Sequence, residues 1–238
     1  MTVAAVDKNP QRIAAMFDGI AKRYDFLNRV LSAGLDRRWR ANAIRAMRLG
    51  PDARVLDLCA GTADFAIAAA RVSSGVRVVG VDFAAAMLAI GRGKLDDAGL
   101  SDRVRLVRGD ATTIPVRDAW ADAATIGFGI RNVIEPARAL RELARVIKPG
   151  GTLAILEFGE PVVPGVRQIY NWYFRQVLPR LGRLVSHHDS AYAYLPASVG
   201  LFPSPGEFAA TISSHGFDSV RAVPLSLGIV YLYIATRA

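Results

Sequence analysis

The segment RVLDLCAGTAD at 54–64 limits the folds that this chain can adopt more than any other part of the sequence. Its first four residues form a short, mostly apolar run that ends in Asp57 and then breaks into a turn of small residues, which is typical of a buried strand. The alanine-rich residues that follow predict a helix. Small residues in the turn let a ligand approach the backbone, and the helix N-terminus points toward that ligand.

A second apolar run at 77–82 ends in another carboxylate, Asp82, which is placed to bind both hydroxyls of a ribose. Of the three glycines that a phosphate-binding turn requires, only Gly61 is present, because Cys59 and Ala63 occupy the other two positions. We therefore expect a nucleoside with an uncharged or cationic attachment, such as S-adenosylmethionine. An ordinary strand–turn–helix connection without a ligand is the alternative.

Predicted strands and helices alternate along most of the chain, which favours an α/β fold with a doubly wound, mostly parallel sheet. The last two strands predict a hairpin that adds an antiparallel edge. Ligands of such sheets bind at the carboxyl ends of the strands, where Asp57, Asp82, Asp110 and Gly127 fall. The seven predicted strands lie at 54–57, 77–82, 104–107, 123–126, 152–158, 219–225 and 229–236, with a turn predicted at 148–151.

The chain has 238 residues, of which 52% are hydrophobic, and we expect one domain. Helices predicted at 10–30 and 36–47, the second with Asp36 as its N-cap, form an N-terminal cap. No apolar run of about 18 residues and no signal-peptide core is present, so we expect a cytoplasmic protein. Cys59 is the only cysteine and cannot form an internal disulfide or a zinc cluster, so no metal is expected. The predicted parts are the cap at 1–50, a cofactor-binding core at 51–160, a cap insertion at 161–205 and a C-terminal helix with the edge hairpin at 206–238.

The net charge of +9 is concentrated in two segments. Residues 1–50 carry ten Lys and Arg against four Asp, and residues 161–190 carry four Arg against one Asp, so the rest of the chain is neutral. Both segments are also rich in aromatic and long apolar side chains. This combination predicts a surface that contacts anionic lipid headgroups or nucleic acid. Arginines on solvated helix surfaces are the alternative explanation.

Five segments carry a more specific signal: MFDGIAKRYDFLN at 16–28, DRRWR at 36–40, FGIRNV at 128–133, LEF at 156–158 and AYAYLPASV at 191–199. Together they resemble the ubiquinone/menaquinone biosynthesis C-methyltransferase family, and the similarity extends from about Arg12 to the end of the chain. The N-terminal and tyrosine-rich segments are the most specific. The resemblance implies a Rossmann-like methyltransferase that transfers a methyl group from S-adenosylmethionine to a ring carbon of a polyprenylated hydroquinone. It leaves open a naphthoquinol (demethylmenaquinol), a benzoquinol or both, and whether the protein is a homodimer.

The resemblance also implies roles for individual cofactor-binding residues. Thr62 would lie in the cofactor turn, Asp82 would bind the ribose, and Asp110 with Ala111 would lie beside the adenine. Gly127 departs from the family, which often has serine there, so only its backbone is available for a contact. The full predicted cofactor-binding set is Asp57, Gly61, Thr62, Asp82, Asp110, Ala111 and Gly127.

Methylation of a ring carbon requires a carbon nucleophile, and a phenol becomes one when its hydroxyl loses a proton. Because a phenol has a pKa near 10, a base or a nearby cation is required. Arg131 is predicted to stabilise the phenolate, Asn132 to orient the ring oxygen, and Asp25 or His187 to act as the base. The alternatives are that Arg131 pairs with a carboxylate such as Glu157, that Asn132 caps a helix, and that Asp25 and His187 are structural.

A polyprenyl tail is insoluble in water, so we expect peripheral contact with the anionic inner face of the cell membrane, with Phe26, Leu27, Val30 and Leu31 lining a groove for the tail. No nucleic-acid partner is expected. An RNA methyltransferase would share this core and the basic surface, but a cytosine-carbon enzyme needs a cysteine after a later strand, and Cys59 lies in the cofactor turn. A non-catalytic lipid-binding protein on the same fold is the other alternative, favoured only by the missing glycines.

Overall fold

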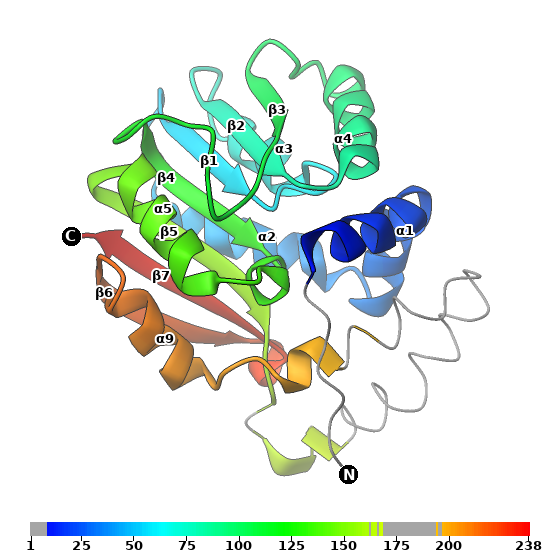
Figure 1. Ribbon diagram of the computed structural model, residues 1–238, viewed down its shortest axis with the longest axis vertical. Helices are drawn as coiled ribbons and strands as arrows, with labels where there is room; N and C mark the ends of the chain where they lie inside the picture. The colour runs from blue at the N-terminus through cyan, green and yellow to red at the C-terminus, as the bar shows by residue number, and fades with distance from the viewer. Residues whose placement is uncertain (1–8, 162, 166, 169–193, 195–196) are drawn as a thin grey trace.

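The computed structural model describes residues 9–161, 163–165, 167, 168, 194 and 197–238 (Figure 1). These residues build a central sheet of seven strands in the order β3-β2-β1-β4-β5-β7-β6. The strands are β1 Arg54–Leu58, β2 Arg77–Asp82, β3 Val104–Arg108, β4 Ala121–Gly127, β5 Ile147–Phe158, β6 Phe217–Leu225 and β7 Val230–Arg237. The α-helices are α1 Pro10–Leu31, α2 Leu35–Met47, α3 Asp64–Ala70, α4 Ala85–Asp97, α5 Pro136–Val146 and α9 Pro205–Ser213, and short 3-10 helices are η1 Ile130–Asn132 and η3 Ser226–Gly228.

The strand pairing confirms the predicted doubly wound sheet. β1 to β5 pair in parallel, whereas β7 pairs antiparallel with both β5 and β6. The C-terminal hairpin therefore forms the antiparallel edge that the sequence predicts. The order of winding reverses between β1 and β4, and in sheets of this kind the ligand binds beside that reversal, at the carboxyl ends of the strands.

Helices cover both faces of the sheet, as Figure 1 shows. Residues of α2, α3 and α4 form one apolar layer, which contains Trp39, Phe65 and Leu88. Residues of α5 and α9 form the other layer, which contains Leu140 and Phe208. Because both faces are covered, the central strands are apolar on both sides, as is typical of parallel sheets.

Helix α1 packs along α4 rather than on the sheet (Figure 1). A separate small apolar cluster joins the two helices. It contains the buried residues Ala21, Ala84 and Met87, with the partly buried Phe17, Tyr24, Ala86 and Ile90 around them. This position brings α1 over the carboxyl ends of the strands, where the sequence predicts the ligand site.

Two local predictions are wrong. Asp36 is not the N-cap of α2, because Gly34 takes that position with a φ of 77° that suits glycine. Asp36 instead lies in the first turn and accepts a hydrogen bond of 2.9 Å from the Ser32 hydroxyl. The segment 148–151 is not a separate turn but an irregular part of β5, in which the pairing with β4 shifts register after Ile147.

Candidate active site

A pocket opens at the carboxyl ends of β1, β2 and β4, below helix α1. Residues from α1 form one wall, and the turns that follow the strands form the others. Most of the wall is apolar, and its polar side chains come from the ends of the strands or just after them. The lining includes Ile13, Ala14, Phe17, Tyr24, Cys59, Gly61, Asp82, Met87, Asp110, Ala111, Gly127, Phe128, Asn132, Val133 and Ile134.

The turn after β1 keeps the shape of a glycine-rich turn although two of its glycines are replaced. Cys59, Gly61 and Ala63 all take the left-handed conformation, with φ values of 57°, 52° and 67°. Each non-glycine residue in this region costs about 1 kcal/mol of strain. Packing maintains both conformations, since Ala63 is fully buried and Cys59 contacts Gly129 so closely that a Cβ there would lie 2.3 Å from the Cys59 Cβ. The missing glycines therefore do not prevent this turn from forming.

Asp82, the last residue of β2, is hydrogen-bonded to the turn that follows β1. Its Oδ2 accepts a hydrogen bond from the Gly61 N–H at 2.7 Å, and its Oδ1 accepts one from the Ala84 N–H at 2.8 Å. Burial raises the pKa of Asp82, while these backbone hydrogen bonds oppose the shift. A carboxylate oxygen accepts more than one hydrogen bond, so the two oxygens still have capacity for ribose hydroxyls.

Asp110 and Ala111 line the same pocket after the end of β3. The Asp110 Oδ1 accepts hydrogen bonds from the Thr112 N–H at 2.7 Å and from the Thr112 hydroxyl at 2.8 Å. These bonds orient the carboxylate and do not occupy Oδ2. Among the described residues no hydrogen bond engages Oδ2, and a carboxylate oxygen beside a backbone N–H matches the donor and acceptor of an adenine edge, so these residues fit a nucleoside.

Asp57 and Thr62 border a second, adjoining pocket that is also lined by Gly61, Asp64 and Arg40. Asp57 is buried, and it accepts hydrogen bonds from the Thr125 hydroxyl at 2.8 Å and from the Ala66 N–H at 3.0 Å. Burial raises its pKa to about 7, and the nearby Asp82 and Asp64 add to the rise. The carboxyl group of Asp57 is therefore poised to ionise when a cation binds beside it.

Gly127 ends β4 at the floor of the main pocket. A Cβ at this position would lie 2.8 Å from the Phe65 ring. The serine that the resemblance implies at this position does not fit here unless Phe65 moves. The Phe65 ring of α3 thus occupies the space that a side chain at position 127 would need, and only the backbone of Gly127 faces a ligand.

Arg131 forms a buried ion pair with Glu157, as the structural alternative for this residue predicts. Its Nη1 lies 2.7 Å from the Glu157 Oε1, and the exposed fractions of the two side chains are 7% and 0%. The guanidinium also lies 5.4 Å from the centre of the Phe158 ring. Arg131 does not line the main pocket itself but lies behind its wall.

Asn132 does line the pocket, and its side chain is bonded to a tyrosine of the C-terminal half. The Tyr194 hydroxyl donates a hydrogen bond of 3.0 Å to the Asn132 Oδ1. Burial raises the pKa of both Tyr24 and Tyr194, but the positive charge of Arg131 acts in the opposite direction on each. The charge of Glu157, the partner of Arg131, raises the pKa of Tyr194, so the two charges of the pair oppose each other there.

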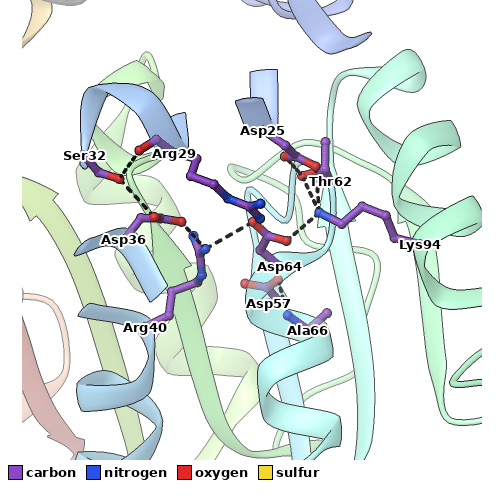
Figure 2. Close-up of polar contacts among 10 residues, drawn as sticks. All are labelled: Asp25, Arg29, Ser32, Asp36, Arg40, Asp57, Thr62, Asp64, Ala66 and Lys94. Carbon is purple, nitrogen blue, oxygen red and sulfur yellow. Dashed lines mark hydrogen bonds and ion pairs between the residues drawn. The ribbon is translucent and has the colours of Figure 1, made fainter. Parts of the chain in front are cut away.

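Asp25 lies beside the cofactor turn, in a polar network that Figure 2 shows. The Thr62 hydroxyl donates to the Asp25 Oδ1 at 2.6 Å, and the Lys94 ammonium lies 2.8 Å from the Oδ2. Lys94 and Asp64 were not predicted from the sequence, because no spacing along the chain brings residues of α1, the turn and α4 together. The other candidate base, His187, lies outside the described residues.

Nearly the whole chain matches a protein-family model. The family model described as the ubiE/COQ5 methyltransferase family covers residues 5–237. The chain belongs to the ubiE/COQ5 methyltransferase family. The match confirms the family that the sequence segments predict and the prediction that the protein is a methyltransferase.

Two curated relatives illustrate how close the chain is to other members of the ubiE/COQ5 family. The ubiquinone/menaquinone biosynthesis C-methyltransferase UbiE of Geobacter sp. (strain M21) is 44% identical over 234 residues, which cover 98% of this chain and 99% of the relative. The demethylmenaquinone methyltransferase of Mycobacterium marinum is 44% identical over 233 residues, which cover 98% of this chain and 96% of the relative.

Solved structures confirm the expected Rossmann-like fold. A SAM-dependent methyltransferase from Aquifex aeolicus superposes with a TM-score of 0.63, covering 97% of this chain and 99% of that one. Its sequence identity is only 18%, so this likeness concerns the fold alone. Among the residues that the structure describes, no helix is both long enough and apolar enough to cross a lipid bilayer.

Proposed function

We propose that the protein transfers a methyl group from S-adenosylmethionine to a ring carbon of a polyprenylated hydroquinone in quinone biosynthesis. The observation that carries this proposal is the composition of the main pocket. Carboxylates suited to a nucleoside lie at its strand ends, whereas the wall that α1 supplies is apolar and aromatic. The names of the two relatives, one for ubiquinone and menaquinone biosynthesis and one for demethylmenaquinone, support a quinol ring as the substrate.

The residues present fit S-adenosylmethionine. Asp82 would bind the ribose hydroxyls, Asp110 and Ala111 would bind the adenine edge, and Gly61 and Gly127 would allow close approach along the backbone. Asp57 and Thr62 border the adjoining pocket, where an ionised Asp57 would attract a cationic group. When bound, the cofactor supplies an electrophilic methyl group on a sulfonium.

The catalytic roles follow from the electrostatics of the pocket. Burial raises the pKa of both Tyr24 and Tyr194, but the positive charge of Arg131 opposes that rise, so Arg131 would favour ionisation of a substrate phenol held nearby, partly offset by the charge of Glu157. Asn132 and Tyr194 would hold the ring oxygen by hydrogen bonds. In this arrangement Arg131 stabilises the phenolate from behind the wall, and Glu157 fixes its orientation. His187 stays a candidate for the base.

Contact with the membrane is part of the proposal. Phe26 of α1 is 60% exposed, and Ile134 in the pocket lining is 53% exposed, so both large apolar side chains are accessible to a membrane. Together with the basic N-terminal segment, they suit peripheral binding to an anionic membrane at the cytoplasmic face. The side chains of Leu27, Val30 and Leu31 lie outside what the structure describes. Co-sedimentation should be stronger with anionic than with neutral liposomes, and equal binding would refute the electrostatic contribution.

The reaction is tested with labelled S-adenosylmethionine and three acceptors: reduced demethylmenaquinol, the demethylated benzoquinol and bulk RNA. Wild type should transfer label to one or both quinols, and Asp82→Ala should lose most of that transfer because the ribose contact is removed. The labelled quinol identifies the ring. Label in RNA, or in none of the three despite cofactor binding, would contradict the proposed function.

A further inference from the structure

Helix α1 supplies a wall of the pocket, but it belongs to neither layer of helices on the sheet, so its position depends on other contacts. We propose that Lys94 is a positioning residue that fastens α1 to the cofactor turn, and that Asp25 is the anchor on α1 rather than a base. The expected effects on KM and kcat rest on the proposed function. The attachment of α1 to the cofactor turn does not, because it is made by contacts within the protein.

The Lys94 ammonium lies where three segments meet (Figure 2). It lies 2.8 Å from the Asp25 Oδ2 on α1 and 3.2 Å from the Thr62 hydroxyl oxygen in the turn, and it also pairs with Asp64, the first residue of α3. The Thr62 hydroxyl in turn donates to Asp25 at 2.6 Å. A single side chain of α4 therefore joins α1 to the cofactor turn.

A second polar contact attaches α1 to the other end of α4. The Asp18 Oδ1 accepts a hydrogen bond of 2.8 Å from the Ala86 N–H, in the first turn of α4. Ala84 is the N-cap of α4, and its side chain cannot accept a hydrogen bond from the first turn of the helix. The Asp18 carboxylate of α1 accepts that hydrogen bond instead. Asp18 and Asp25 lie seven residues apart, about two helical turns, and thus on one face of α1. The apolar cluster of α1 and α4 lies between these two anchors.

The contacts of Asp25 argue against a role as the base. Both of its carboxylate oxygens are engaged, one by the Thr62 hydroxyl and the other by Lys94. Asp25 is also absent from the lining of the main pocket, whereas Tyr24, the preceding residue, lines it. A proton transfer to Asp25 would disrupt the attachment of α1, so its contacts suit a fixed anion better than a proton acceptor.

Removal of the lysine should loosen α1 without unfolding the protein. Asp64 keeps a partner in Lys94→Met, because the Arg40 guanidinium lies 3.3 Å from its other oxygen. The Lys94 and Asp25 side chains are 27% and 34% exposed, so water reaches the pair, and its loss costs far less than that of a fully buried pair. The expected consequence is weaker retention of cofactor and substrate, with the chemical step less affected.

The test compares Lys94→Met, Lys94→Arg and Asp25→Asn with wild type, and uses Lys148→Met as the matched control. Lys148 forms a partly exposed pair with Asp122 near the opposite ends of the strands. The measurements are the Kd for S-adenosylhomocysteine, amide hydrogen exchange in α1, and KM and kcat with the quinol that wild type methylates.

Lys94→Met and Asp25→Asn should each raise the cofactor Kd and the quinol KM about five- to tenfold and speed exchange in α1, while kcat changes less than about threefold. Lys94→Arg should restore part of the affinity, and Lys148→Met should match wild type. An unchanged Kd with unchanged exchange in Lys94→Met would overturn the proposal. The proposal would also be overturned if Asp25→Asn lost about a hundredfold in kcat with a normal Kd and its pH profile lost the fall in rate at low pH that a general base causes. If wild type methylates no quinol, the proposed function fails, but binding and exchange still decide the role of Lys94.

Discussion

The substitution Asp57→Asn tests whether the carboxyl group beneath the cofactor turn is protonated in the free protein. Asp57 is 1% exposed and contacts the Thr125 hydroxyl and the Ala66 N–H. Asparagine has the same shape, and it can accept from Ala66 through its oxygen and donate to Thr125 through its amide. It therefore mimics the protonated acid at every pH.

The expected effect has a definite sign. With a pKa of about 7 in the folded state, against 3.8 when unfolded, Asp57 binds its proton more tightly in the native protein. Its contribution to stability is fully present below pH 4 and is lost as the pH rises through 7. Linkage gives a loss of about 2.5 kcal/mol in the free energy of unfolding between pH 5 and pH 8. The asparagine variant lacks this loss.

Urea unfolding of wild type and Asp57→Asn at pH 5, 6, 7 and 8, without cofactor, measures the difference. The stability of the variant relative to wild type should rise by about 2.5 kcal/mol from pH 5 to pH 8. Asp122→Asn is the control, because hydrogen bonding and the charge of Lys148 lower the pKa of Asp122, so its ionisation is complete below this range. A relative stability of Asp57→Asn that stays constant from pH 5 to pH 8 would refute the ionisation argument.

The cofactor should alter this dependence in a way that connects it with binding. Under the proposed function, a cationic ligand beside Asp57 favours the ionised carboxylate and lowers its pKa. Cofactor affinity of wild type should therefore weaken as the pH falls below 7, whereas the affinity of Asp57→Asn should be lower and nearly independent of pH. The ionised Asp57 carboxylate would thus destabilise the free protein but attract the cationic ligand.

Three further substitutions have expected outcomes. Gly127→Ser should cost about 1–3 kcal/mol in urea unfolding because its Cβ meets the Phe65 ring at 2.8 Å, and Phe65→Leu in the same chain should recover part of that loss. Arg131→Met leaves Glu157 buried without its cation and should cost about 3–5 kcal/mol, whereas Arg131→Met with Glu157→Gln should cost less in a double-mutant cycle. Ser204→Ala removes the capping box of α9 and should lower the free energy of unfolding by about 1 kcal/mol, with no change in cofactor affinity.

The sheet could be predicted from the sequence because strands and turns are encoded by short stretches of consecutive residues. Apolar runs such as 77–82 and the turns between them identify strands, and the alternation with helices gives parallel pairing. The carboxylates Asp82 and Asp110 could be assigned to the site because their places at or just after strand ends follow from the same pattern. The prediction of Asp36 as an N-cap was wrong because Gly34, two residues earlier, is the N-cap and the helix begins at Leu35.

The remaining contacts of the site could not be predicted, because they join residues far apart in the chain. The Arg131–Glu157 pair was foreseen only as an alternative, and the sequence alone could not decide between it and a direct contact with substrate. The contact between Asp25 and Lys94 spans 69 residues and depends on how α1 lies along α4. Amphipathic spacing predicts that a helix forms but does not identify the element on which it packs.

Substitutions at the expected glycine positions illustrate how packing replaces a local rule. Cys59 and Ala63 take backbone conformations that glycine adopts without strain, and the cost of about 1 kcal/mol at each is small beside the packing that surrounds them. Both side chains fill space against glycines on neighbouring segments, Cys59 against Gly129 and Ala63 against Gly91. The absence of side chains at Gly129 and Gly91 leaves room for Cys59 and Ala63 in this turn. Glycines counted within the turn alone do not predict this, because Gly91 and Gly129 lie elsewhere in the chain.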